Sequence, residues 1–100
     1  MAQRYLIRNT YLEGPHKGTS YLMRKGGYVA GDTGPYFLSD TYVSYGIALR
    51  QCRRMADDNK LNCRLQKQDH ERLIKQGKQP GIKIYYQESY EPVPVDTYEF

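Results

Sequence analysis

Short apolar runs separated by turn residues fill the first forty positions. The runs are β-favouring and occur at residues 5–8, 19–24, 28–30 and 36–38. Loops rich in Gly and Pro separate them, at residues 13–18, 25–27 and 31–35. Glycine turns of this kind join neighbouring antiparallel strands. The pattern therefore predicts a meander of three or four short strands.

A helical period replaces this pattern in the middle of the chain. Apolar side chains then recur at helical spacing and form one stripe: Ile47, Ala48, Cys52, Met55 and Ala56. Ser44 is our predicted N-cap, with residues 39–41 as the alternative. We expect this helix to end near Asn59.

The next residues predict two further elements. Leu61, Cys63 and Leu65 alternate with polar residues, which is the period of a half-buried strand. Asp69 can then cap a second short helix at residues 69–76, which Gly77 would stop.

Residues 82–87 carry the clearest strand alternation in the chain. After them, residues 89–100 contain Pro92 and Pro94, whose nitrogens cannot donate to a sheet, so we expect an extended acidic arm or an edge segment there. The expected fold is a single α+β domain over residues 1–100. It has an antiparallel β-meander packed on one main amphipathic helix, a second short helix, a C-terminal strand and an extended tail.

Composition adds an excess of tyrosine and an uneven charge. The chain has 100 residues, eleven of them Tyr and none Trp, and a formal net charge of +4. Residues 45–83 carry ten Lys or Arg against four acidic residues, whereas residues 84–100 carry four acidic residues and no basic one. A basic middle and an acidic tail attract each other, so part of the basic field is neutralised internally.

Cellular context is predicted from the cysteines and from apolar runs. Cys52 and Cys63 occur without an export signal, so we expect reduced thiols and a cytoplasmic location, with one close pair as the alternative. No apolar run is long enough to predict a membrane span.

One string resembles a catalytic motif. Asp32-Thr33-Gly34 resembles the catalytic turn of aspartic proteases, in which two such loops share one proton. Gly31 before it and Pro35 after it depart from the family's pattern, and a basic amphipathic helix does not suit that all-β fold. We interpret the string as an ordinary turn and expect no enzyme activity.

Metal and cofactor signatures are also missing from the sequence. Cys52, Cys63, His16 and His70 lack the tight spacing of structural zinc sites. The glycines of residues 26–34 do not form a phosphate-binding string between a strand and a helix. We therefore expect neither a metal nor a cofactor.

What remains is a binding surface made of basic and tyrosine side chains. Its candidate residues are Arg50, Arg53, Arg54, Arg64, Lys67, Tyr42, Tyr45 and Tyr85. Tyr and Arg dominate protein–protein hot spots, so a protein partner is the leading expectation, with a homodimer through the C-terminal arm as a further one. The alternative is nucleic acid, with the cations on phosphates and sheet tyrosines stacking on bases. The plain interpretation is a solvated helix face, with Asp57 and Asp58 as counter-charges.

The layout from Tyr-Leu-Ile-Arg-Asn, through Lys-Gly-Gly-Tyr-Val and Tyr-Phe-Leu-Ser-Asp-Thr, to Ser-Tyr-Gly-Ile-Ala-Leu resembles short bacteriophage and prophage products. The likeness covers about residues 1–60. It implies an accessory factor that binds a host or phage protein, and anti-defence inhibitors, including anti-CRISPR proteins, share this size. No motif of that group maps onto particular residues here.

Overall fold

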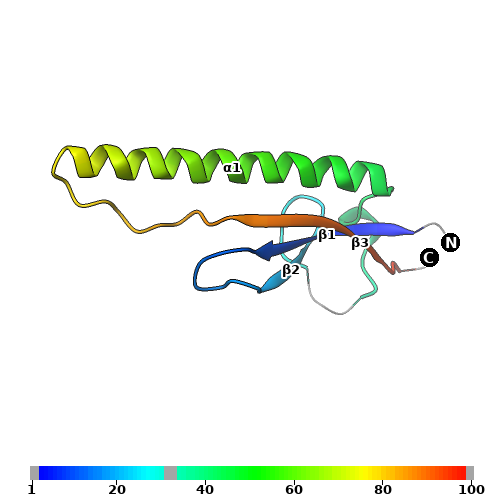
Figure 1. Ribbon diagram of the computed structural model, residues 1–100. Coiled ribbons are helices and arrows are strands. Elements are labelled where there is room, and N and C mark those ends of the chain that lie inside the picture. Colours follow the sequence, from blue (N-terminus) through cyan, green and yellow to red (C-terminus); the bar gives the residue numbers. More distant parts are fainter. Residues whose placement is uncertain (1–2, 31–33, 99–100) are drawn as a thin grey trace.

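The computed structural model describes residues 3–30 and 34–98. Its elements are β1 (Arg4–Tyr11), β2 (Ser20–Met23), a short 3-10 helix η1 (Leu38–Asp40), α1 (Tyr45–Lys75) and β3 (Glu88–Val95). The three strands form an antiparallel sheet in the order β2-β1-β3, and α1 lies against one face of it (Figure 1). The predicted α+β class, with one main helix on an antiparallel sheet, is confirmed.

Both ends of α1 are defined by their caps. The Ser44 hydroxyl accepts a hydrogen bond from the Ile47 amide at 3.2 Å, which confirms the predicted N-cap. At the other end Gly77 adopts a φ of +73°, and Lys78 donates from its amide to the Leu73 carbonyl at 2.8 Å. This is the glycine-terminated C-cap that releases the chain from a helix. The 31 residues between the caps make a helix about 46 Å long.

A single helix replaces three predicted elements. The expected end near Asn59, the strand at residues 61–65 and the separate helix at 69–76 are wrong, because α1 runs through all of them. Residues 47–76 contain neither Gly nor Pro and are rich in Leu, Arg, Lys and Gln, so nothing interrupts the helix. Leu61 and Leu65, which suggested a half-buried strand, instead lie one turn apart on the surface of the helix, where they are 47% and 48% exposed.

The C-terminal strand is displaced from its predicted position. Residues 82–87 are extended but outside the sheet, whereas β3, an edge strand, includes both prolines of the segment predicted as an arm or edge segment. Tyr5 uses its backbone N–H and C=O on Tyr42, at 3.0 and 2.8 Å, so Pro94 opposite Tyr5 needs no amide hydrogen. Pro92, two residues earlier, faces the same way. An edge strand tolerates prolines in this arrangement.

The other predicted strands are reduced to single bridges. Residues 28–30 pair with the sheet only at Val29, opposite Met23. Residues 36–38 form one bridge, at Tyr36 opposite Thr97, which lies just beyond the end of β3. Because β1 lies between β2 and β3, the sheet is a β1–β2 hairpin with the C-terminal strand added to its other edge.

The packed core occupies one end of an elongated molecule. Its buried centre combines Ile7, Tyr42, Ala48 and Cys52, with Tyr5, Met55 and Tyr90 packed around it. The radius of gyration is 16.9 Å, compared with about 13 Å for a compact domain of this length. Figure 1 shows the reason: α1 continues past the sheet, and the chain returns beneath it as a lone extended segment. We call residues 60–87, the distal part of α1 and this return, the projection.

Candidate functional site

Two amide side chains of α1 hold the returning segment. Asn59, which is 8% exposed, donates from Nδ2 to the Tyr86 carbonyl at 2.9 Å and to the Glu88 carboxylate at 3.2 Å. Its Oδ1 accepts from the Glu88 amide at 3.0 Å. The Tyr90 hydroxyl donates to the same Glu88 carboxylate at 2.8 Å. Asn59 therefore takes the place that a neighbouring strand would occupy at the start of β3.

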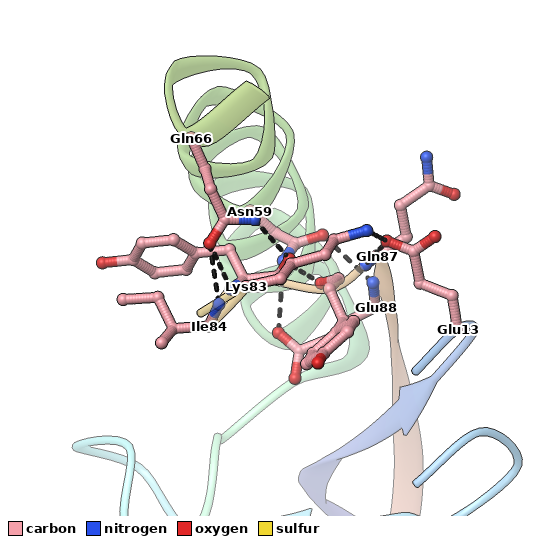
Figure 2. A network of polar contacts seen from close by, with 9 residues as sticks. Glu13, Asn59, Gln66, Lys83, Ile84, Gln87 and Glu88 are labelled. Carbon is pink, nitrogen blue, oxygen red and sulfur yellow. Dashed lines mark hydrogen bonds and ion pairs between the residues drawn. The ribbon is translucent and has the colours of Figure 1, made fainter. Parts of the chain in front are cut away.

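Gln66 repeats this contact two helical turns further on. Its Oε1 accepts from the amides of Ile84 and Tyr85 at 2.8 and 3.0 Å, and its Nε2 donates to the Tyr85 carbonyl at 3.0 Å. Figure 2 shows Asn59 and Gln66 pointing from the helix to the segment. Residues seven apart share one helix face. Both amides continue the line of Ala48, Cys52 and Met55, so the buried stripe of α1 changes from apolar to polar at Asn59.

The loop after β1 fixes the segment from the other side. The Glu13 carboxylate accepts from the Gln87 amide at 3.0 Å and from Lys83 Nζ at 3.1 Å. The Gln87 amide first, and then Lys83, lower the pKa of Glu13. Gly14, with a φ of +87°, lies against the Tyr86 ring, where an added Cβ would be 2.6 Å from a ring carbon. Only glycine fits there without displacing Tyr86.

One side of the projection is basic. Lys60, Arg64 and Lys67 share a helix face, and with Lys83 they line a groove of about 630 Å³. Glu13 and Glu71 also line this groove. Between residues that the structure describes, no carboxylate lies within ion-pair distance of the three helix cations, whereas Lys83 is paired with Glu13. The groove thus presents cations that remain available to an anion.

The opposite side of the projection gathers exposed apolar side chains, and we call it the apolar side although Asn62, Gln66, Asp69 and His70 also line it. Leu65 and Leu73 from α1 and Ile82, Ile84 and Tyr85 from the return line a shallow groove of about 410 Å³. Ile82 is 88% exposed, Ile84 69% and Leu65 48%. Side chains of this size are normally covered when they gather in one place.

The structure separates the predicted cationic binding residues into two groups. Arg64 and Lys67 line the basic groove, while Arg50, Arg53 and Arg54 are exposed nearer the start of α1 and do not line it. Arg50, Arg53 and Arg54 are spaced at i, i+3 and i+4, so they are neighbours on one side of the helix, outside this groove. Asp57 and Asp58 form no ion pair with them among the described residues.

The predicted tyrosines are also dispersed. Tyr42 is 8% exposed and belongs to the core, so its assignment to a binding surface is corrected. Tyr45 is 52% exposed and packs edge-to-face on Tyr5, with ring centres 5.8 Å apart. Tyr85 lies on the apolar side of the projection. Tyr28 follows the turn at residues 25–27, and the Arg24 guanidinium lies 5.7 Å from its ring centre.

Sequence reasoning missed the residues that build the projection. Lys83 and Glu13 are seventy residues apart, and no local pattern joins them. A signal existed for Asn59 and Gln66, since both extend the helical spacing of the apolar stripe. The chance alternation of Leu61, Cys63 and Leu65 concealed it.

The two cysteine thiols are far apart, and both have raised pKa values. Both cysteines are free, and eleven residues of one helix place them about 16 Å apart, too far for a disulfide. Burial raises the pKa of Cys52 to about 11 and also raises the pKa of Cys63.

No cluster of three potential metal ligands occurs among residues 3–30 and 34–98. Asp32 and Thr33 of the protease-like string lie outside the described residues.

Comparison with known proteins finds no counterpart: no family model, curated protein or solved structure matches the chain. In the part of the chain that the structure describes, no helix combines the length and apolarity needed to cross a membrane.

Proposed function

We propose that this chain is a non-catalytic binding protein that contacts a protein partner through the apolar side of its projection. One observation carries the proposal: Leu65, Ile82, Ile84 and Tyr85 gather, 41% to 88% exposed, at a distance from the core. Exposed apolar groups that are contiguous mark interaction surfaces more often than isolated ones do. Tyr85 adds the residue type that is enriched at hot spots.

The resemblance to phage products extends this proposal to a biological setting. The chain would be a small accessory or anti-defence factor that binds a host or phage protein in the host cytoplasm. The expected cytoplasmic location is based on cysteine usage and follows the same proposal.

Adjacent helix residues give a matched test. Leu65 lies on the apolar side and Arg64 on the basic side, and both are exposed, so either can be replaced without disturbing the core. We expect immobilised Leu65→Glu to lose a protein that the unmodified chain retains from an extract of its own cells. Arg64→Glu should retain it at both low and high salt, because apolar contacts respond little to ionic strength. Equal retention by both variants would contradict the proposal.

The basic groove supports a second candidate, binding of nucleic acid. Lys60, Arg64 and Lys67 are spaced at one helical turn and are free to meet successive phosphates. A labelled single-stranded oligonucleotide of about twelve nucleotides tests this directly. This candidate predicts that binding falls steeply with salt, is lost in Arg64→Glu and survives in Leu65→Glu. Absence of oligonucleotide binding at low salt, or binding that Arg64→Glu leaves unchanged, would contradict this candidate.

A further inference from the structure

We propose that the protein partner of the apolar side is a second copy of this chain, bound antiparallel about a two-fold axis at Leu65. This inference depends on the proposed function only in using the same surface as a protein-binding site. It adds the identity of the partner and the geometry of the contact.

The exposed surface of the single chain is the first argument. Its accessible area is 7355 Å², whereas a folded monomer of 11.7 kDa exposes about 5,900 Å². The excess of about 1,500 Å² exceeds the roughly 800 Å² that each partner buries in a standard interface. Since the projection extends away from the core, we assign much of this excess to it. A second copy could cover it without any change in the fold.

Charges around Leu65 supply the second argument. Asp58 and Arg72 lie seven residues before and after Leu65, on the same side of α1, and both are exposed. Within its own helix Arg72 pairs with Asp69 at 3.1 Å, an exposed ion pair that leaves other donors of the guanidinium available to a partner. An antiparallel partner related by a two-fold axis at Leu65 places its Arg72 beside Asp58 and its Asp58 beside Arg72. A two-fold interface must be self-complementary in this way. A parallel pairing would instead bring like charges together.

The shape of the apolar groove fits the same partner. Leu65 and Leu73 lie on one wall, with Asp69 between them, and Ile82 and Ile84 form the other. The partner's α1 would place its own Leu65 against this groove and its Leu61, which is 47% exposed one turn away, beside the Asp69–Arg72 ion pair. The basic cations at positions 60, 64 and 67 lie on another helix face and remain outside the contact.

The test is the mass of the full-length chain by sedimentation equilibrium across micromolar concentrations. We expect a concentration-dependent dimer, and a monomer for Leu65→Glu, which brings two carboxylates together at the axis. Arg64→Glu is the matched control and should dimerise unchanged. Circular dichroism should show the same helix content in all three proteins.

Charge reversal identifies the pairing. Asp58→Arg alone and Arg72→Asp alone should each weaken the dimer by about tenfold or more, because two contacts become repulsive. Mixing these two variants should restore dimers, and so should combining both changes in one chain. Asp58 and Arg72 are about 21 Å apart within one helix, so no contact inside a chain can produce this rescue.

Each outcome is decisive. A chain that stays monomeric at every concentration overturns the inference, and so does a dimer that Leu65→Glu leaves intact or that the double variant fails to restore. If the monomeric chain still captures a different protein through Leu65, the inference fails while the proposed function stands. If neither self-association nor capture depends on Leu65, both fail.

Discussion

Replacing Asn59 with aspartate should release the returning segment from α1. The change keeps the oxygen that accepts from the Glu88 amide but removes the donor to the Tyr86 carbonyl and to the Glu88 carboxylate. A hydrogen bond between neutral groups contributes about 1 kcal/mol and one to a charged group about 1.5–3 kcal/mol. The new carboxylate also faces that of Glu88. We expect a loss of about 3 kcal/mol or more at pH 7.

The pH dependence of this variant has a definite sign. Repulsion from Glu88 would raise the pKa of the introduced carboxyl group in the folded chain above its unfolded value of about 3.9. A carboxyl group with a raised folded pKa is most favourable when protonated, so the deficit grows as pH rises from about 4 through the folded pKa. Once protonated, the introduced group also regains one donor. The deficit should therefore be smaller at pH 4 than at pH 7.

Urea unfolding at both pH values measures the effect. With a slope of about 1–1.5 kcal/mol per molar urea for a domain of this size, the midpoint at pH 7 should fall by about 2 M or more. Hydrogen exchange at the Glu88 amide reports the local release. Asn62→Asp is the control, because Asn62 is half-buried on the same helix and its side chain makes no hydrogen bond among the described residues. We expect it to change stability by no more than about 0.5 kcal/mol. Equal losses at both positions would refute the role assigned to Asn59.

Three further predictions concern the loop and the thiols. Gly14→Ala should cost about 1–3 kcal/mol in chemical unfolding, from positive φ and collision with Tyr86, and an unchanged midpoint would contradict the packing. Because the pKa of Glu13 is lowered, its contribution is complete above about pH 4.3 and lost as pH falls through the folded pKa. Glu13→Gln should make the free energy of unfolding less dependent on pH below about pH 4.3. An unchanged pH dependence would show that ionised Glu13 does not contribute to stability. Iodoacetamide should label Cys63 before Cys52, because Cys52 is only 3% exposed and its pKa is about 11. Mass spectrometry of the digested chain measures the order of labelling, and faster labelling of Cys52 would contradict this prediction.

The sequence predicts the elements that depend on local signals. Ser44 was identifiable because a side-chain cap acts on the following turn, and the β1–β2 hairpin because loop glycines and apolar runs alternate nearby. The course of residues 60–95 depends instead on distant partners. The alternation of residues 82–87 has no strand beside it, since Gln66 and Asn59 use the available backbone groups, whereas β3 accepts two prolines because β1 bonds to the intervening residues.

The binding residues were only partly predictable for the same reason. The cationic character of Arg64 and Lys67 is visible in the sequence, but their separation from Arg50, Arg53 and Arg54 depends on the uninterrupted helix. No local pattern distinguishes Tyr42 from a surface tyrosine, and it is its bridge to Tyr5 that places it in the core. Ile82 and Ile84 have the spacing of a buried strand, but they are exposed because the return lies beyond the edge of the sheet.

The clasp formed by Asn59 and Gln66 has an evolutionary consequence. Apart from the bond between Asn59 and the Glu88 carboxylate, both side chains bind main-chain groups of residues 84–88, and almost every amino acid has these groups. The exposed residues at positions 82, 84 and 85 can therefore be replaced while the segment stays bound to α1. The binding specificity of this surface can then change during evolution without loss of the fold. The same tolerance makes these positions a natural place to graft foreign recognition sequences or to build a randomised library.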